Sequence, residues 1–88
     1  MTIHLKTAKD LGAAIRRARK QLKLTQPDLA LASQVGVRFI VELEAGKPTV
    51  RFESVMRVID ALGGELLLAG LPNPNGDEPE SGSGVIDG

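Results

Sequence analysis

The sequence predicts a small, mostly α-helical domain of four or five helices followed by one short strand. Apolar residues recur at three- and four-residue steps in several segments, which is typical of amphipathic helices. Capping pairs precede the first two of these segments, and Gly residues follow the last two. With 88 residues, two Phe and no Trp or Tyr, the chain allows one domain with an aliphatic core. Domains of this size often gain stability by dimerising.

The first helix is predicted over roughly residues 8–22. Thr7 and Asp10 have the spacing of a capping box at its start. The apolar stripe consists of Leu11, Ala14, Ile15, Ala18 and Leu22. Residues 2–6 alternate between polar and apolar, which favours a short strand but also fits a frayed N-terminus.

Residues 25–46 predict two short helices joined by a tight turn. Thr25 and Asp28 repeat the capping spacing, and a proline in the first turn costs no hydrogen bond there. The turn is expected at residues 33–36, and Gly46 has the position of a C′ glycine after the second helix. The two helices carry too few apolar residues to be stable alone. We interpret this segment as a helix-turn-helix that lies in a DNA groove and packs on the helices before and after it.

A fourth helix is predicted to start near Arg51, after Pro48, and to end at the Gly pair 63–64. Its expected core stripe is Phe52, Val55, Met56, Ile59 and Leu62. The apolar stretch 65–71 is short and bounded by Gly and Pro, so a strand is favoured there. One strand needs a partner: either residues 3–6, or its copy in a second subunit across a two-fold axis, or both.

Charge divides the chain into a basic domain, residues 1–71, and an acidic tail, residues 72–88. The domain carries eleven positive and seven negative side chains, and the tail carries four acids, so the formal net charge of zero hides a balance of +4 against −4. Seven of the positive side chains lie in residues 1–23. This asymmetry is typical of a domain that binds a polyanion. A solvated helix face with a solubilising tail remains the alternative, and the Pro-, Gly-, Ser- and acid-rich tail is expected to be disordered.

The residue inventory argues against enzymes and metal sites. No Cys is present, which excludes disulfides, thiolate zinc sites and cysteine nucleophiles. His4 is the single histidine and has no neighbouring ligand set. We therefore expect no catalytic residues, no metal and no cofactor. Because no segment approaches a signal peptide or a membrane span, we expect a cytoplasmic protein without membrane contacts.

The segment LTQPDLALASQVGVRFIVELEAGK resembles the helix-turn-helix of the phage-repressor or XRE family, and most closely the small HipB-like antitoxins and regulators. The resemblance covers about residues 8–63 and implies a lambda-repressor-like fold. The apolar stretch Glu65, Leu66, Leu67, Leu68 and Ala69 has the position of the dimer-forming strand in HipB-like proteins. The matching positions are Leu24, Gln26, Leu29, Ala30, Val35, Ile40, Leu43, Glu44, Gly46 and Lys47.

The resemblance also implies individual roles. Gln26 would hold a phosphate or a base edge at the start of a helix. Glu44 would pair with Arg19 and tie the recognition helix to the first helix. Many relatives have Gly at the first position of the turn, where this chain has Gln34, so the turn is expected to be strained or slightly shifted.

In the family register, a few side chains face the DNA groove. Arg38 is the best candidate to bind guanine, because a guanidinium reaches O6 and N7 together. Glu42 would accept from cytosine N4 or pair with Arg38. The basic residues of the first helix would contact phosphates. The expected DNA-binding residues are Gln26, Gly36, Val37, Arg38, Val41, Glu42, Lys47 and Arg51.

Three functions fit these residues. In the first, a homodimeric antitoxin represses its own operon at a palindromic operator and binds a HipA-like kinase toxin. In the second, the protein is a stand-alone XRE-type regulator without a toxin. In the third, it is a protein-binding adaptor built on the same fold, which would apply if Val37 and the turn prevent DNA binding.

Overall fold

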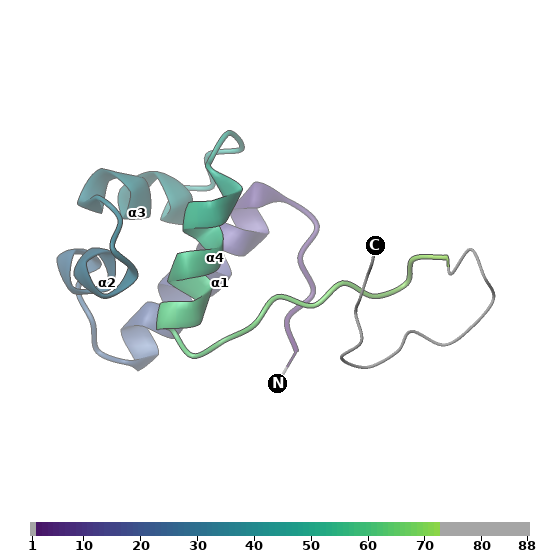
Figure 1. Cartoon of the computed structure of the whole chain (residues 1–88), viewed down its shortest axis with the longest axis horizontal. Helices are drawn as coiled ribbons and strands as arrows, with labels where there is room; N and C mark the ends of the chain where they lie inside the picture. Colours follow the sequence, from purple (N-terminus) through teal and green to yellow (C-terminus); the bar gives the residue numbers. More distant parts are fainter. Residues whose placement is uncertain (1, 73–88) are drawn as a thin grey trace, which may run out of the picture.

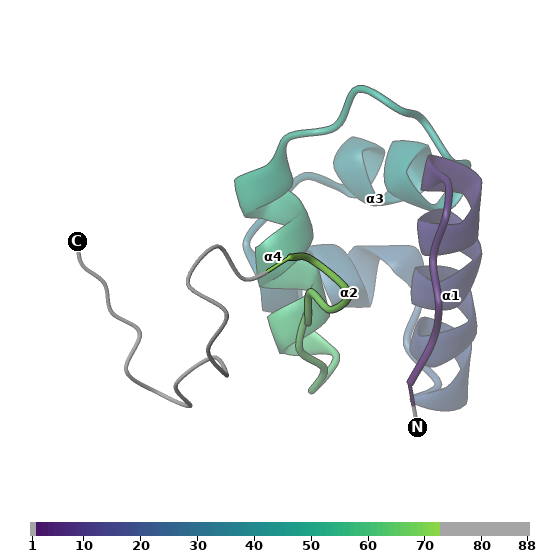
Figure 2. The same ribbon diagram turned by 90° about the vertical axis from the view of Figure 1, so that its right-hand side faces the viewer.

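The computed structural model describes residues 2–72 (Figure 1), and this part of the chain contains four α-helices. They are α1 (Ala8–Gln21), α2 (Gln26–Ser33), α3 (Val37–Glu44) and α4 (Phe52–Ala61). The views in Figures 1 and 2 place α2 and α3 on one side of α1 and α4, and segments 2–6 and 65–72 on the other. The prediction of a mostly helical domain with four helices is confirmed. None of these helices is long and apolar enough to cross a membrane.

Both predicted capping boxes are present. At the start of α1, the hydroxyl of Thr7 accepts from the backbone N–H of Asp10, and the carboxylate of Asp10 accepts from the backbone N–H of Thr7. At the start of α2, Thr25 and Asp28 exchange the same two bonds at 3.1 and 2.9 Å. These bonds satisfy N–H groups that have no partner inside a helix, and so they determine where α1 and α2 begin.

The turn between α2 and α3 is left-handed at Gln34, with φ 60° and ψ 43°. The backbone N–H of Val35 then donates to the carbonyl of Ala30 at 3.0 Å, and the Val35 side chain packs against the core. This is the hydrogen-bond and apolar pattern of a Schellman helix end. The turn is therefore not shifted along the chain, and a residue other than Gly takes the αL position at a cost of about 1 kcal/mol.

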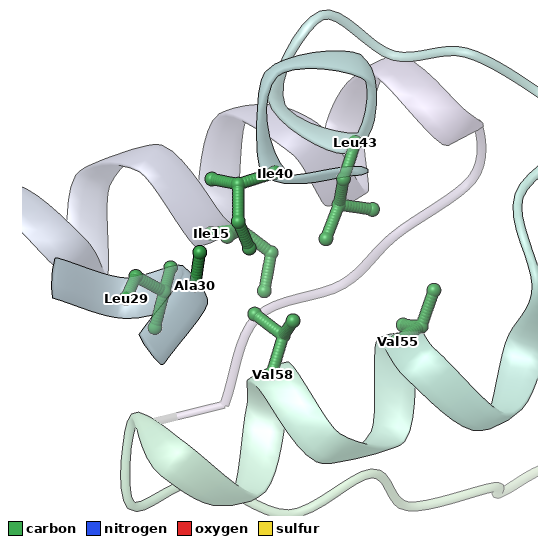
Figure 3. Close-up of a cluster of buried hydrophobic side chains, with 7 residues drawn as sticks. All are labelled: Ile15, Leu29, Ala30, Ile40, Leu43, Val55 and Val58. Carbon is green, nitrogen blue, oxygen red and sulfur yellow. The ribbon is translucent and has the colours of Figure 1, made fainter. Parts of the chain in front are cut away.

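The core lies where the four helices meet. Leu29, Ile40, Leu43 and Val58 are fully enclosed, and Ala30 is 2 % exposed. Figure 3 shows side chains from all four helices converging on one cluster. The cluster consists of Ile15, Leu29, Ala30, Ile40, Leu43, Val55 and Val58. Since α2 contacts both α3 and α4, only a small side chain fits where Ala30 lies.

The predicted core stripe of α4 is confirmed for Val55, Ile59 and Leu62, which pack in the core, and is wrong for Phe52 and Met56. Phe52 is 65 % exposed and Met56 is 42 % exposed, whereas Val58, which the prediction omitted, is fully buried. The apolar residues of α4 cover more of the helix surface than the part that contacts the core. The predicted stripe was therefore centred too far toward Phe52. The side chains that pack inward are Val55, Val58, Ile59 and Leu62. Leu22 is also exposed, because α1 ends at Gln21 before it.

The terminal segments contain no strand within the described range. Residues 2–6 and 65–72 form neither helix nor strand in the single chain, and the backbone bends at Gly70, where φ is 85°. Strand pairing across a two-fold axis needs a second subunit, so it stays a prediction. The tail is described only at Pro72, and its remainder, 73–88, lies outside the described residues.

Gly12 allows α1 to approach the end of α3. A Cβ at this position would collide with the carbonyl oxygen of Leu43 and lie 2.7 Å from that of Glu44. Both obstacles are backbone atoms, which cannot move aside as a flexible side chain would. The contact between α1 and α3 therefore depends on the absence of a side chain at residue 12.

We predict that Gly12→Ala lowers the free energy of unfolding by about 1–3 kcal/mol, the usual cost of overpacking. The matched control is Gly36→Ala, because a Cβ at Gly36 meets no atom within 4 Å and its φ of −75° suits any residue. Urea unfolding followed by circular dichroism measures both variants. Equal stability of the two variants would contradict the close approach at Gly12.

We also predict that the capping box of α2 makes the stability of the protein depend on pH in the acidic range. The backbone N–H of Thr25 holds the pKa of Asp28 below the ordinary value of 3.8. The stabilisation is therefore complete above that value and is lost as the pH falls through the lower folded-state pKa. Asp28→Asn should melt below the wild type at pH 7, and the difference should shrink as the pH falls below 3.8 and through the lower folded-state pKa. Asp60→Asn, which removes the same charge from an exposed site on α4, should show no such convergence.

Candidate nucleic-acid interface

The outer face of α3 consists of Val37, Arg38, Val41 and Glu42. The opposite face buries Ile40 and Leu43 in the core, which fixes the rotation of the helix. As a result, the Arg38 side chain is 90 % exposed, and Val37 and Val41 expose nearly half of their surface. The structure therefore brings the α3 residues of the predicted groove face together on one exposed surface.

A carboxylate bridges two cations on this face. One oxygen of Glu42 lies 3.4 Å from Nε of Arg38, and the other lies 3.3 Å from Nζ of Lys47. The hydrogen bond from Lys47, and more weakly that from Arg38, holds the pKa of Glu42 below its usual value. Glu42 is thus ionised at neutral pH, and the three side chains form one cluster at the end of α3.

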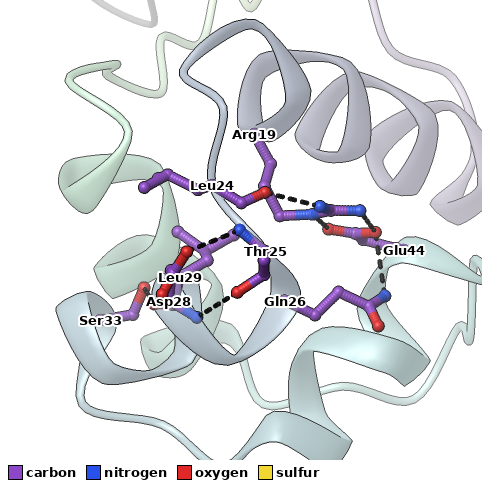
Figure 4. Close-up of polar contacts among 8 residues, drawn as sticks. All are labelled: Arg19, Leu24, Thr25, Gln26, Asp28, Leu29, Ser33 and Glu44. Atoms are coloured by element: carbon purple, nitrogen blue, oxygen red, sulfur yellow. Dashed lines mark hydrogen bonds and ion pairs between the residues drawn. The ribbon is translucent and has the colours of Figure 1, made fainter.

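A second polar cluster, with Arg19 and Glu44 at its centre, is shown in Figure 4. Nε and Nη2 of Arg19 donate to the two carboxylate oxygens of Glu44 at 2.6 and 3.0 Å, and Nη1 donates to the carbonyl of Leu24 at 2.8 Å. The exposed fractions of the Arg19 and Glu44 side chains are only 10 % and 4 %. The hydrogen bond to Glu44 raises the pKa of Arg19 above its usual value. The pair joins α1 to the last turn of α3.

Gln26 belongs to the same cluster. Its Nε2 donates to Oε1 of Glu44 at 3.1 Å, so its amide is held at the start of α2 rather than extended into solvent. The sequence did not predict this bond. The spacing of Gln26 and Glu44 in the chain carries no signal for it, because the two residues meet only after α2 and α3 have packed.

Basic side chains of α1 continue this surface past the end of α3. A shallow groove between the two helices is lined by four of them together with Glu44 and Ala45. The four are Lys9, Arg16, Arg17 and Lys20. Four of the seven positive side chains that the sequence places in residues 1–23 therefore lie next to the end of α3, in a groove that Asp10 also lines.

The remaining predicted residues occupy two other places. Gly36 and Arg51 are exposed and precede α3 and α4 as their N-cap residues. The strand residues 65–69 are also exposed, but they lie on the side of the molecule opposite α2 and α3 (Figures 1 and 2). Among residues 2–72, no group of His, Asp and Glu side chains is arranged to hold a metal ion.

Comparison with known proteins agrees with this geometry. The sequence profile of the helix-turn-helix family matches residues 15–68. The chain belongs to this family. This chain is also 48 % identical, over 63 residues, to the uncharacterized HTH-type transcriptional regulator y4mF of Sinorhizobium fredii. The match covers 72 % of this chain and 83 % of that protein. This chain is a DNA-binding transcriptional regulator of the XRE type.

Solved structures share the fold of this helix-turn-helix regulator. HipB in a complex with an O4 20mer superposes with a TM-score of 0.71 at 17 % identity, covering 78 % of this chain and 97 % of HipB. A HipA–HipB–O2–O3 complex gives the same values. The clp gene regulator ClgR from C. glutamicum has a TM-score of 0.63 at 33 % identity, covering 75 % and 85 % of the two chains. The fold is therefore HipB-like, and a regulator of another kind shares it.

We predict that the Arg19–Glu44 pair is strongly coupled. Arg19→Met leaves the Glu44 carboxylate buried without its main partner and should cost about 3–5 kcal/mol of stability. Adding Glu44→Gln removes that stranded charge, so the double variant should be less destabilised than the sum of the single variants by about 0.5–3 kcal/mol. Urea unfolding of the wild type, Arg19→Met, Glu44→Gln and the double variant measures the coupling. Arg17→Met, on the exposed face of α1, is the control and should change stability by less than about 0.5 kcal/mol; additive single variants would contradict the coupling.

Proposed function

We propose that the protein is a sequence-specific transcriptional repressor that inserts α3 into the major groove of operator DNA. The observation that carries this proposal is the exposed outer face of α3, which has an exposed guanidinium at Arg38 and is flanked by the basic side chains of α1. A major groove admits one α-helix, and positive side chains beside it neutralise phosphates.

Individual roles follow from placement. Arg38 binds guanine, Val37 and Val41 contact thymine methyl groups, and Glu42 accepts from the amino group of cytosine. Lys47 and Arg51, together with the basic side chains of α1, hold phosphates. Gln26 lies at the N-terminus of α2, and it reaches a phosphate or base edge by exchanging its bond to Glu44. Gly36 is exposed as the N-cap residue of α3 and lies against the DNA backbone.

We further propose that the repressor is a homodimer on a palindromic operator. Residues 1–71 would form the domain, and the strand 65–69 would pair with its copy across a two-fold axis. Its Leu67 and Leu68 are 70 % and 80 % exposed in the single chain, which leaves them available for a second subunit. Pairing on the side opposite α2 and α3 keeps both copies of α3 free for half-sites about one helical turn apart.

The preferred biological role is that of an antitoxin that represses its own operon and binds a HipA-like kinase toxin. The support is the HipB-like fold, which recurs in the complex containing HipA and HipB. The alternative is a stand-alone regulator, which the similarity to ClgR supports. A kinase-like reading frame beside the gene distinguishes the first role from the second. Residues 72–88 would be an acidic appendage to either, and both roles imply a cytoplasmic protein.

We predict that Arg38→Ala loses sequence discrimination while it keeps salt-sensitive binding to any duplex. Loss of one bidentate contact to guanine should cost about 1–3 kcal/mol of discrimination. A mobility-shift titration against the DNA upstream of the gene and against unrelated DNA measures both affinities. Arg17→Ala, which removes the same charge from α1, should weaken binding to both duplexes equally. Equal binding of the wild type to both duplexes would overturn the specific-repressor proposal.

A further inference from the structure

The outer face of α3 carries an acid where a surface that meets DNA would be expected to carry only neutral or positive groups. Glu42 lies beside Arg38, Val37 and Val41, and its side chain is 32 % exposed. It contacts both cations in reach, Arg38 from the preceding turn and Lys47 from the loop after α3. In the free protein the two side chains proposed to hold a guanine and a phosphate are thus both paired with one carboxylate.

Both contacts are weak enough to exchange. They lie at 3.4 and 3.3 Å between exposed groups, and ion pairs of this kind contribute little to stability. Binding to DNA would move Arg38 to a base edge and Lys47 to a phosphate. The Glu42 carboxylate would then lose its partners while facing a polyanion, and a charge that is desolvated without a partner is unfavourable.

Every base pair carries one amino group in the major groove, and only the base that bears it can replace the partners that Glu42 loses. In the major groove, cytosine presents the N4 amino group and adenine presents the N6 amino group, whereas guanine and thymine present acceptors at the corresponding positions. An ionised carboxylate accepts hydrogen bonds and cannot donate them. The Glu42 position therefore meets a favourable contact on some sequences and repulsion on the others.

We propose that Glu42 is a specificity filter that acts mainly by repulsion. It weakens binding to every duplex in which the base opposite it lacks an amino group, and it keeps Arg38 and Lys47 paired until a matching site is reached. Specificity of this kind depends on a penalty against wrong partners as much as on attraction to the right one. This inference rests on the proposed function of α3 and adds a penalty to the acceptor role of Glu42.

The test selects binding sites from a pool of duplexes with a randomised centre, using the full-length wild type, Glu42→Gln, Glu42→Ala and Glu53→Gln. Affinity is then measured for the selected site and for a fixed duplex that lacks it. Glu53→Gln is the matched control, because Glu53 forms the same i, i+4 pair with Arg57 at 3.4 Å, on α4. Both Gln variants change the net charge equally, so their difference isolates the position of the charge.

We expect Glu42→Gln to bind the fixed duplex about two- to fivefold more tightly than Glu53→Gln, which is the range that one exposed ion pair supplies. The ratio of selected-site to fixed-duplex affinity should fall by at least as much. Glu42→Ala should also lose the preference for one base pair in the selected site. Melting temperatures check that all four proteins are folded.

Two outcomes would overturn the inference. If Glu42→Gln and Glu53→Gln have the same affinities and select the same site as the wild type, the filter is wrong while the DNA-binding function stands. If the wild type selects no site from the pool, the proposed function fails and the inference fails with it. Tighter binding of Glu42→Gln to the fixed duplex, with a weakened selected-site preference, supports both.

Discussion

The buried ion pair between Arg19 and Glu44 is the contact on which the arrangement of the first three helices depends. Arg19 uses all three of its nitrogens: two on the Glu44 carboxylate and one on the Leu24 carbonyl before α2. Glu44 also accepts from Gln26 at the start of α2. One pair of side chains therefore fixes the end of α3 relative to α1 and to the beginning of α2. The close crossing at Gly12 brings α1 near enough for Arg19 to reach.

This arrangement separates the sources of affinity and of specificity. The groove beside α3 collects the cations of α1, whose attraction for phosphates is independent of sequence. The outer face of α3 carries the side chains that differ in their preference for bases. Because the ion pair holds the two surfaces in a fixed relation, contacts made by α1 also set the register in which α3 meets the groove.

Local sequence signals predicted the helix boundaries well, because the capping boxes at Thr7 and Thr25 form between neighbours in the chain. Periodicity was less informative for α4. Its apolar arc is wider than the face it buries, so the pattern alone could not distinguish Val58 from Met56. The bond between Gln26 and Glu44 was missed for a related reason, since it exists only once two helices have packed. Strand pairing at residues 65–69 is a property of two chains and no single-chain pattern can establish it.

Several of the polar side chains proposed to contact DNA already have partners in the free protein. Gln26 is bound to Glu44, and Arg38 and Lys47 are bound to Glu42. Recognition must then be an exchange of hydrogen bonds within the protein for hydrogen bonds to DNA, and its free energy is a difference between the two sets. A wrong sequence fails to replace the bonds that were given up, which costs more than the simple absence of a favourable contact. On this view, the internal bonds of the free protein enlarge the difference between matching and non-matching sites while lowering the affinity for both.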